Sequence, residues 1–454
     1  LFFSDQRKPV SALPELRLPG TDVREPFQPE ARLGQALPEH LPREECRHEP
    51  ATDCPDCGQP LSDFGADSAE MLEYEPAQFK IICHVRVKRR CGHCQTILQG
   101  EGPSRPIPRS AAGPGLLAQV LVAKYADHLP LYRQSEIYGR SGVPLTRSTL
   151  ADWVKGASAL LAPLTDAIGR HVKGGTTLHG DDTPVPVLAP GKGKTRTGRL
   201  WTYVRDDRPA AGEVAPAVWF RYAPDRKSHR PQGHLEDFCG VLQADGYAGF
   251  RALYERPENP VTEAACWAHA RRKFYDLHEA NRSPIAHEAL DRIGALYGIE
   301  AELRGLPPEA RRSARQARAG PLLDDLHRWL MATYAAASKK SALAGAIQYT
   351  LKRWAALTRY RDHGDVEIDN NAAERALRSV ALGRKNYLFA GSDAGGERAA
   401  AIYSLIGTAK LNGVDPYLYL REVLGRIADH PINRIEELLP WNIDLPKPAD
   451  RKTD

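Results

Sequence analysis

Two pairs of cysteines constrain the fold of this chain more strongly than any other feature of its sequence. They form the motifs Cys54-Pro55-Asp56-Cys57 and Cys91-Gly92-His93-Cys94, separated by 33 residues (91 − 57 − 1 = 33). Four thiolates on two tight turns match the tetrahedral sulfur site of one structural zinc ion. The alternative is that the cysteines only pack or form a redox pair. The interval exceeds the usual ~15–20 residues, which leaves room for an inserted hairpin.

The strand expected between the two motifs is basic. From residue 79 to residue 100 the chain has no acidic residue, so alternation would place positive side chains along one face. A solvated charged face is one interpretation, but we favour contact with a nucleic-acid backbone because the run has one sign of charge. Residues 1–53 carry 7 − 10 = −3 of the net charge of +5, so the remaining chain carries 5 + 3 = +8. The residues predicted to contact DNA here are Lys80, Arg86, Lys88, Arg89 and Arg90.

Residues 1–50 are rich in proline and charge and lack an apolar period, so we expect a disordered linker there. Because the chain begins with Leu1 rather than Met, we expect that a further segment precedes it. The start resembles no secretion signal, and no run approaches the ~18–20 uncharged apolar residues of a membrane span. We therefore expect a cytoplasmic protein without a membrane partner.

Residues 110–172 are predicted to be helical. Arg133–Arg140 and Arg147–Gly156 can form two helices joined by the turn Ser141-Gly142-Val143-Pro144, with Thr146 as N-cap of the second helix. This is the outline of a helix-turn-helix, which would place Arg147 against DNA. Two packed helices of an ordinary bundle are an equally good interpretation of so short a pattern.

Beyond residue 173 the pattern changes to strands, with a hairpin tip at residues 191–194, and from residue 262 to residue 360 it changes to helices. The predicted strands are Thr177–Asp181, Val185–Leu188, Leu200–Val204, Ala217–Tyr222 and Gly240–Ala244.

Two of these strands end on a carboxylate. Asp181 ends the first and Asp245 directly follows the last, 245 − 181 = 64 residues later, and carboxylates at neighbouring strand ends can share a Mg²⁺ ion. Glu374 lies on a predicted helix with Asp369 as its N-cap, and Arg378 one turn later can pair with that carboxylate or with phosphate. Taken singly, each acid is better explained as a cap, a turn residue or a surface charge. The pattern alone does not select these three from 57 acidic residues.

Five longer motifs make the selection possible. In order and spacing they resemble the insertion sequence 66 family of bacterial DDE transposases, and the resemblance extends over about residues 41–440. The motifs are Gly180-Asp181-Asp182-Thr183-Pro184, Gln243-Ala244-Asp245-Gly246-Tyr247, Cys266-Trp267-Ala268-His269-Ala270-Arg271-Arg272-Lys273-Phe274, Asp369-Asn370-Asn371-Ala372-Ala373-Glu374-Arg375-Ala376-Leu377-Arg378 and Ser392-Asp393-Ala394-Gly395-Gly396-Glu397-Arg398-Ala399-Ala400.

The resemblance implies an α/β fold with an RNase H-like mixed-sheet catalytic core. A large helical insertion would interrupt this core, and a zinc ribbon and a helix-turn-helix region would precede it. The implied segments are the ribbon at 51–100, the helical DNA-binding region at 110–172, the core at 173–260 and 363–412, the insertion at 261–362 and a family-specific C-terminal segment at 413–454.

The acidic triad of the family falls on Asp181, Asp245 and Glu374, which would hold two Mg²⁺ or Mn²⁺ ions. Asp181 would bridge both ions, Asp245 would bind one and Glu374 the other, so that water or a DNA 3′-hydroxyl attacks the phosphate in line. Cys266 and His269 resemble a cysteine-x-x-histidine signature, for which packing or substrate positioning is a better role than zinc binding because one helix supplies only two ligands. Family members often have Glu where this chain has Asp182, and the strand-end position favours Asp181 as the metal ligand.

The implied function is that of a DNA transposase, which cleaves and joins the ends of a mobile insertion sequence in DNA recombination. Its partners would be double-stranded DNA with terminal inverted repeats, target DNA, further copies of the chain in a homo-oligomer and accessory proteins of the same element. Its location would be the bacterial cytoplasm, in association with the nucleoid. The alternative is a catalytically inactive or nuclease-only DNA-binding protein of the same fold.

The segment after Glu374 leaves two interpretations open. Arg384, Lys385, Tyr387 and Phe389 form a basic and aromatic stretch, for which DNA contact and packing of the aromatic rings in the core are both reasonable. Residues 392–396 are expected to form a flexible loop that approaches the substrate backbone and leads into a helix from about Arg398 to Leu411.

Overall fold

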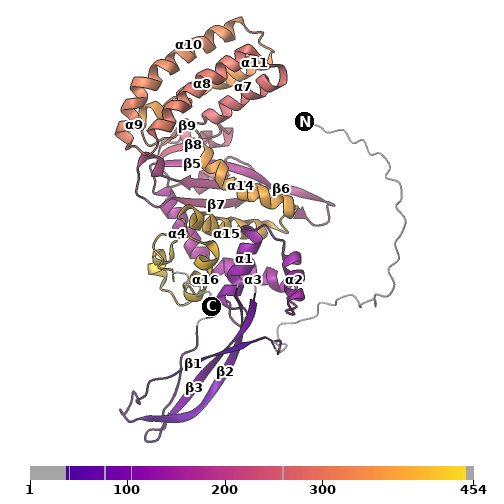
Figure 1. Cartoon of the computed structure of the whole chain (residues 1–454), viewed down its shortest axis with the longest axis vertical. Coiled ribbons are helices and arrows are strands. Elements are labelled where there is room, and N and C mark those ends of the chain that lie inside the picture. Colours follow the sequence, from indigo (N-terminus) through magenta and orange to yellow (C-terminus); the bar gives the residue numbers. More distant parts are fainter. Residues whose placement is uncertain (1–36, 40, 76–77, 104, 258–259, 446–454) are drawn as a thin grey trace, which may run out of the picture.

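The computed structural model describes residues 37–39, 41–75, 78–103, 105–257 and 260–445. Most of the expected linker at residues 1–50 therefore lies outside the described residues. Figure 1 shows an elongated molecule with a long stranded ribbon at one end, followed by helices, a central sheet and a second group of helices at the other end. No helix in the described part of the chain is long and apolar enough to cross a membrane.

The cysteine module is a small sheet built on one long hairpin. Its strands are β1 (Arg43–His48), β2 (Leu61–Glu75), β3 (Gln78–Cys91) and β4 (Ile97–Gln99). The antiparallel pair β2–β3 fills the interval between the two cysteine motifs. Strand β1 pairs in parallel with β3 although it falls within the expected linker. Its side chains are mostly exposed, so no apolar alternation marked this edge strand in the sequence.

Four helices follow: α1 (Pro114–Tyr125), α2 (Leu131–Arg140), α3 (Arg147–Leu160) and α4 (Ala162–Lys173). Thr146 caps α3, since its hydroxyl oxygen accepts a hydrogen bond from the Thr149 N–H at 3.1 Å. Gly142 has a φ of +78° in the turn after α2, a conformation that favours glycine. Both α2 and α3 are longer than expected because Leu131 and Leu160 extend their contacts with the core.

The central sheet has five strands in the order β7-β6-β5-β8-β9. Strand β6 runs antiparallel to β5 and β7, whereas β8 and β9 run parallel to β5. The chain is thus a mixed α/β protein, as predicted. The strands are β5 (Thr177–Ala189), β6 (Lys194–Arg205), β7 (Ala217–Ala223), β8 (Gly240–Ala244) and β9 (Val261–Ala265).

Two strands differ from the expectation. β5 is one continuous strand, because Pro184 and Pro186 lie beyond its pairing with β8 and a missing N–H there removes no ladder hydrogen bond. Their carbonyls instead accept hydrogen bonds from Arg384 and Ala390. β9 lies inside the segment expected to be a helical insertion, so the insertion begins after Ala265. Pairing with β8 overrides the helical preference of its Glu and Ala residues.

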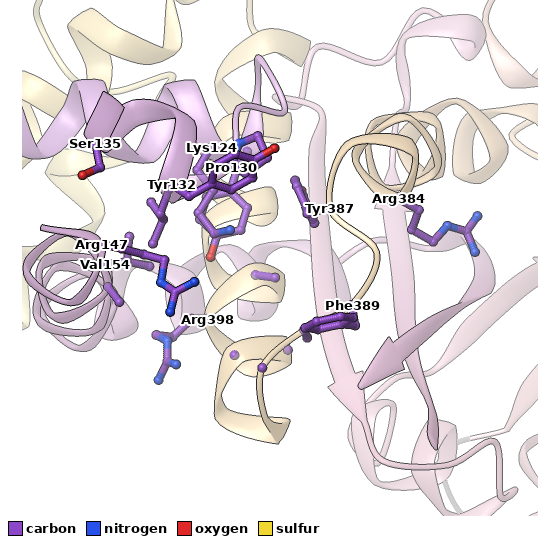
Figure 2. A pocket seen from close by; sticks show the side chains of 18 of the residues that line it. Lys124, Pro130, Tyr132, Ser135, Arg147, Val154, Arg384, Tyr387, Phe389 and Arg398 are labelled. Carbon is purple, nitrogen blue, oxygen red and sulfur yellow. The ribbon is translucent and has the colours of Figure 1, made fainter. Parts of the chain in front are cut away.

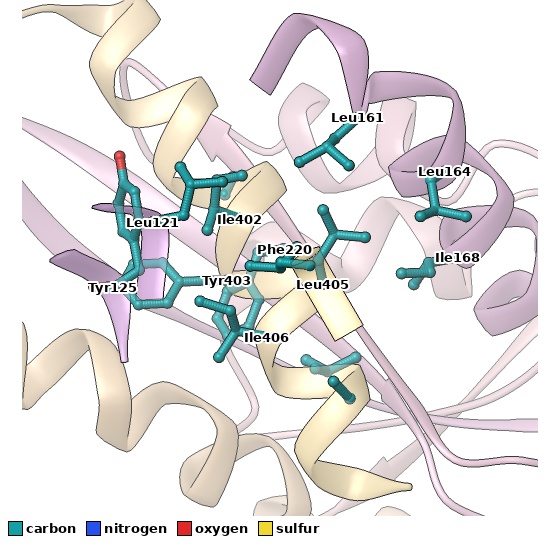
Figure 3. Packing of buried hydrophobic residues seen from close by; sticks show 14 of the residues in the cluster. Leu121, Tyr125, Leu161, Leu164, Ile168, Phe220, Ile402, Tyr403, Leu405 and Ile406 are labelled. Carbon is teal, nitrogen blue, oxygen red and sulfur yellow. The ribbon is translucent and has the colours of Figure 1, made fainter. Parts of the chain in front are cut away.

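One hydrophobic core joins the sheet to the helices before and after it. The helices α15 (Asp393–Leu411) and α16 (Pro416–Arg426) complete this layer, and a 3-10 turn at Ile432–Leu438 packs on α4. Figure 3 shows Leu121, Ile168, Phe220 and Leu405 meeting in this core. The helices α1 to α4 therefore share one core with the sheet.

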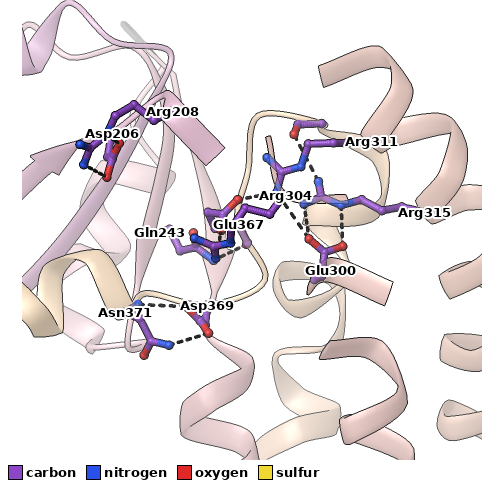
Figure 4. A network of polar contacts seen from close by, with 11 residues as sticks. Asp206, Arg208, Gln243, Glu300, Arg304, Arg311, Arg315, Glu367, Asp369 and Asn371 are labelled. Atoms are coloured by element: carbon purple, nitrogen blue, oxygen red, sulfur yellow. Dashed lines mark hydrogen bonds and ion pairs between the residues drawn. The ribbon is translucent and has the colours of Figure 1, made fainter. Parts of the chain in front are cut away.

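The helical insertion has its own core, centred on Trp267 and Phe274. Its helices are α7 (Trp267–Asn281), α8 (Pro284–Leu303), α9 (Pro308–Ala314), α10 (Gly320–Ala336), α11 (Ala342–Lys352), α12 (Trp354–Leu357) and α13 (Arg359–Asp362). A buried ionic network of Glu300, Arg311 and Arg315 ties α8 to α9 and to the turn that follows it. Figure 4 shows this network reaching Glu367, which lies seven residues before Glu374.

Two local predictions around α14 (Asn371–Asn386) and α15 are wrong. The N-cap of α14 is Asn370, while the Asp369 carboxylate accepts the Asn371 N–H from one position further out. Residues 393–396 are the first turn of α15 and not a flexible loop, because Ser392 caps the helix by accepting the Gly395 N–H at 3.2 Å. Gly396 packs directly on the Tyr222 ring, where a side chain would clash.

Candidate functional site

The two aspartates lie on neighbouring parallel strands, Asp181 within β5 and Asp245 directly after β8. The prediction that Asp181 ends its strand is wrong, because β5 continues to Ala189 through its pairing with β6. The register pairs Thr177 with Val241 and His179 with Gln243, a constant offset of 241 − 177 = 64 residues. The same offset separates Asp181 from Asp245, which directly follows β8. Both side chains therefore stand at the carboxyl end of β8, the edge at which open α/β sheets bind ligands.

Asn370 fixes the start of the helix that carries the third acid. Its side chain is fully buried, and its amide Nδ2 donates to the Gly180 carbonyl at 2.9 Å, next to Asp181. The His179 ring donates to the Asn370 Oδ1 at 3.2 Å, and the Asn370 N–H donates to the Cys266 Sγ at 3.2 Å. Asn370 thus joins β5, the start of α7 and α14, and it brings Glu374, in the first turn of α14, to the same strand.

Gln243 makes a second connection beneath the site. It is fully buried two residues before Asp245, and its Nε2 donates to the Glu367 carbonyl at 2.6 Å and to the Ala265 carbonyl at 3.3 Å. The end of β8 is therefore bonded both to β9 and to the segment that leads into α14. These two amide side chains fix the backbone that carries all three acids.

The acids form a site of concentrated negative charge. Burial raises the pKa of Asp181 to about 7 despite a hydrogen bond from the Asp182 N–H, and the carboxylates of Asp245 and Glu374 contribute to this rise. Repulsion of this kind requires the carboxylates to be close together. It is relieved by protonation or by a bound cation.

Asp182 is in a different position from Asp181. Its side chain is only 2% exposed, and its two oxygens pair with the Arg199 Nη1 at 3.0 Å and the Arg226 Nη2 at 2.8 Å. Arg226 also lies 4.0 Å from the Asp245 Oδ2 and stacks on the Tyr247 ring. Two arginines already satisfy Asp182, whereas the only hydrogen bond to the Asp181 carboxylate in the described part of the structure comes from a backbone amide.

Glu374 faces the start of the insertion. The His269 Nδ1 lies 3.7 Å from its Oε1, and the Arg272 Nη2 lies 3.9 Å from its Oε2. Ligand atoms of Cys266, His269 and Glu374 lie within 4.8 Å of one another. Burial raises the pKa of the Cys266 thiol to about 12, so it stays protonated at neutral pH and suits packing better than metal binding. Arg378 is exposed on α14, and among the described residues it has no hydrogen-bond or ion-pair partner.

The four cysteines of the two motifs come together at the base of the hairpin. The Sγ atoms of Cys54 and Cys94 lie 3.2 Å apart, and that of Cys57 lies 3.5 Å from Cys91 and 3.7 Å from Cys94. All four are free thiols within 4.8 Å of one another. Ligands at about 2.3 Å from a tetrahedral zinc ion stand ~3.8 Å apart, so the donor set fits zinc with little adjustment.

The basic strand β3 is not a strip of free positive charge. Lys88 pairs with Asp67 at 2.7 Å, and Arg89 pairs with Glu49 at 2.7 Å and with Asp63 at 3.2 Å. These carboxylates belong to neighbouring strands and turns, which a scan of β3 alone does not reveal. Of the other residues predicted to contact DNA, Lys80 pairs with Glu44, Arg86 donates to the Gly100 carbonyl, Arg90 stacks on Phe64 and Arg147 is exposed at the start of α3.

Comparison with known protein families agrees with this arrangement. Family models match residues 109–398 (Transposase IS66 family), 404–441 (IS66 C-terminal element) and 51–95 (zinc-finger binding domain of transposase IS66). The chain belongs to the IS66 transposase family. The predicted family is thereby confirmed, and the zinc-finger match covers both cysteine motifs.

Three relatives from Sinorhizobium fredii resemble this IS66 transposase over most of its length. Uncharacterized protein y4hP is 45% identical over 89% of this chain and 76% of its own. Uncharacterized protein y4qI is 39% identical over 91% of this chain and 78% of its own. Uncharacterized protein y4jD is 38% identical over 89% of this chain and 81% of its own.

Several residues around the acids in this IS66 transposase were not predicted from the sequence. Asn370 stands within a motif that was recognised only for its acid, and its position next to the helix start was the available signal. Arg272 stands in the Cys266 motif, three residues after His269. Gln243 stands in the Asp245 motif, two residues before the acid, whereas Arg226 lies outside every motif and gave no signal, because its partners are distant in the sequence.

Proposed function

We propose that this IS66-family protein is a DNA transposase that cleaves and joins the ends of an insertion sequence by two-metal phosphodiester transfer at Asp181, Asp245 and Glu374. The observation that carries the proposal is the β5–β8 register, whose offset of 64 residues, continued by two positions, would bring Asp181 level with Asp245. Glu374 is held to the same strand through Asn370. Burial, with smaller contributions from the carboxylates of Asp245 and Glu374, raises the pKa of Asp181, and a bound cation would compensate these effects.

We also propose that the core is RNase H-like. The proposal is supported by the sheet order β7-β6-β5-β8-β9, in which an antiparallel meander of three strands is extended by two parallel strands. The proposed segments are a ribbon ending near residue 100, a helix-turn-helix region at 110–172, a core divided by the insertion and a C-terminal segment from about residue 413. The position of β9 moves the start of the insertion to residue 266.

The three carboxylates offer the hard oxygen ligands that Mg²⁺ and Mn²⁺ prefer. When bound, two such ions would activate the attacking oxygen and stabilise the leaving oxygen. Asp182, neutralised by Arg199 and Arg226, would hold this part of β5 in place rather than bind an ion. The four cysteines would hold one structural zinc ion.

The positive side chains around the acids would bind the DNA backbone. Arg272 and Arg226 approach Glu374 and Asp245 without a close ion pair to either, at 3.9 and 4.0 Å. Arg272 is 63% exposed and can therefore turn toward a phosphate oxygen, whereas Arg226 is held by Asp182 at 2.8 Å and would contribute its charge from a fixed position. Arg378 is exposed one turn beyond Glu374. His269 would position the substrate next to Glu374. The proposed partners are DNA with terminal inverted repeats, target DNA, further copies of the chain and accessory proteins of the element.

The test is Mg²⁺-dependent cleavage and strand transfer on DNA that carries the element's own ends. Glu374→Gln is expected to lower both activities by about 10³-fold or more while DNA binding, followed by fluorescence anisotropy, persists. Glu279→Gln, on an exposed part of α7, is the matched control and should stay active. Equal activity of Glu374→Gln and the wild type would contradict the assignment.

The same assay separates the alternative functions. A wild-type protein that cuts the ends without joining them would be a nuclease only. A protein that binds the ends and leaves them intact under every divalent metal would be a DNA-binding protein without catalysis.

A further inference from the structure

The loop between α14 and α15 exposes two apolar side chains. Leu388 is 74% exposed and Phe389 is 44% exposed, whereas the preceding Tyr387 is largely covered and its hydroxyl lies 2.6 Å from that of Tyr403. The two aromatic residues of this segment therefore have different environments. Tyr387 is half-buried beside Tyr403, whereas Phe389 and Leu388 face solvent.

The loop is anchored rather than free. The Ala390 N–H donates to the Pro186 carbonyl at 2.8 Å, and the Leu188 N–H donates to the Ala390 carbonyl at 2.9 Å. Ser392 then caps α15. The exposed pair is thus fixed to β5, the strand that carries Asp181. Two apolar side chains that are held in contact with solvent do not stabilise the fold. Exposed apolar side chains on an anchored loop are typical of a binding surface.

A large cavity adjoins Phe389. It has a volume of about 1280 Å³ and lies between α2, α3 and the side of the core formed by β5, α14 and α15. This exceeds the ~300–1,000 Å³ of ordinary small-molecule pockets. Figure 2 shows Arg147, Arg398 and Phe389 around it, with Tyr132 on the side of α2. We call this cavity the interdomain groove.

The interdomain groove is strongly positive. Its lining includes a single carboxylate, Glu136, and five cations: Lys124, Arg140, Arg147, Arg384 and Arg398. Within the described residues none of the five has an ion-pair partner, in contrast to Lys80, Lys88 and Arg89 of β3. Burial and, to a smaller extent, the nearby Arg398 lower the pKa of Lys124 to about 8. An anionic ligand would compensate this charge, and the exposed rings of Tyr132 and Phe389 offer faces on which bases stack.

We propose that Leu388 and Phe389 form a wedge that enters duplex DNA and that the interdomain groove receives the single strand displaced by it. Apolar side chains inserted between base steps unstack and open a duplex, and a positive groove with aromatic faces holds a single strand without sequence preference. The inference rests on the proposed action on DNA ends. The wedge is anchored at Pro186, five residues along β5 from Asp181 (186 − 181 = 5). At ~3.3 Å per residue this is about 17 Å, or about five base-pair steps.

The test compares two DNA probes in a metal-free binding assay with the full chain. One is a paired duplex, and the other is the same duplex ending in a fork of unpaired arms. The wild type is expected to bind the fork at least about 5-fold more tightly, the effect of one stacked base. The double variant Leu388→Ser, Phe389→Ser should lose this preference while binding the paired duplex as before, and Arg398→Gln should weaken fork binding selectively.

The matched control is Leu382→Ser, since Leu382 is an exposed apolar residue on α14 that does not line the groove. It should keep the fork preference, and circular dichroism would verify that all variants are folded. Equal binding of fork and duplex by the wild type overturns the wedge without affecting the proposed catalysis, because no cleavage is measured. A change of molecular mass in the double variant with unchanged fork preference also overturns it, and identifies the loop as a contact between copies of the chain.

Discussion

Glu300 in the helical insertion and Asp181 in the central sheet are carboxylates whose neighbours carry opposite charges. In the insertion, Glu300 accepts hydrogen bonds from the Arg315 Nε at 2.7 Å and Nη2 at 2.6 Å, and Arg311 pairs with both Glu300 and Glu367 (Figure 4). At the sheet edge, Asp181 faces further carboxylates and has no cationic partner among the described residues. A buried acid with arginine partners supports structure, whereas a buried acid among acids indicates a cation site.

The largest effect is expected from removing the charge of Glu300, the acid that pairs with Arg311 and Arg315. Glu300→Gln leaves Arg311 and Arg315 buried with too little negative charge, so the free energy of unfolding should fall by about 3–5 kcal/mol. Urea denaturation followed by circular dichroism measures this change. Glu302, on the same helix as Glu300, forms an exposed pair with Arg318. Glu302→Gln breaks this pair and should lower the free energy of unfolding by less than about 1 kcal/mol. Similar losses for both variants would contradict the distinction.

The stability conferred by the three proposed metal ligands, Asp181, Asp245 and Glu374, should respond to a metal ion. Mg²⁺ at about 100 times its Kd is expected to stabilise the folded protein by about 2.7 kcal/mol, because binding relieves repulsion among the three acids. Thermal melting with and without Mg²⁺ measures the gain. It should disappear in Asp245→Asn and persist in Glu300→Gln. A gain of equal size in Asp245→Asn would place the ion elsewhere.

The raised pKa of Asp181 predicts a pH dependence of stability. The folded protein keeps this proton up to about pH 7, whereas the unfolded chain loses it near pH 4, so the folded state binds more protons in between. Stability therefore falls as the pH rises from about 4 to 7. Without added divalent metal, Asp181→Asn should be about 1–2 kcal/mol more stable than the wild type at pH 8, allowing for partial exposure.

Melting temperatures at pH 5 and pH 8 measure that difference. Asp225→Asn is the control, because the hydrogen bond from Arg230 lowers the pKa of Asp225 to about 2 and its contribution changes only below about pH 4. An unchanged slope between pH 5 and pH 8 in Asp181→Asn would mean that this carboxyl is ionised throughout.

The smallest effect is expected at Arg304, the most exposed arginine of the network around Glu300 and Glu367. Arg304 is 60% exposed and reaches Glu367 at 3.1 Å, so solvent screens the pair. Arg304→Gln should change the free energy of unfolding by less than about 1 kcal/mol in urea denaturation. A loss as large as that of Glu300→Gln would show that the network acts as one unit.

Local sequence patterns predicted the features that depend on neighbours in the chain. The cysteine motifs, the Thr146 cap and the strand before Asp245 all follow from short-range rules, and the family motifs pointed to the three acids. Features that depend on distant partners were not predicted. The segment β9 is a strand because it pairs with β8, which its own residues did not indicate. The positive charge expected on β3 is neutralised by carboxylates from elsewhere in the chain, such as Asp67 and Glu49.

The spacing of the three acids also sets when the site can exist. The ribosome adds 374 − 181 = 193 residues between Asp181 and Glu374, which takes about 10–40 s at ~5–20 residues per second. The cysteine module and the helices α1 to α4 leave the ribosome before the third acid is made. The cysteine module can therefore fold well before the set of three acids is complete, and translation that stops before α14 yields a product that lacks Glu374.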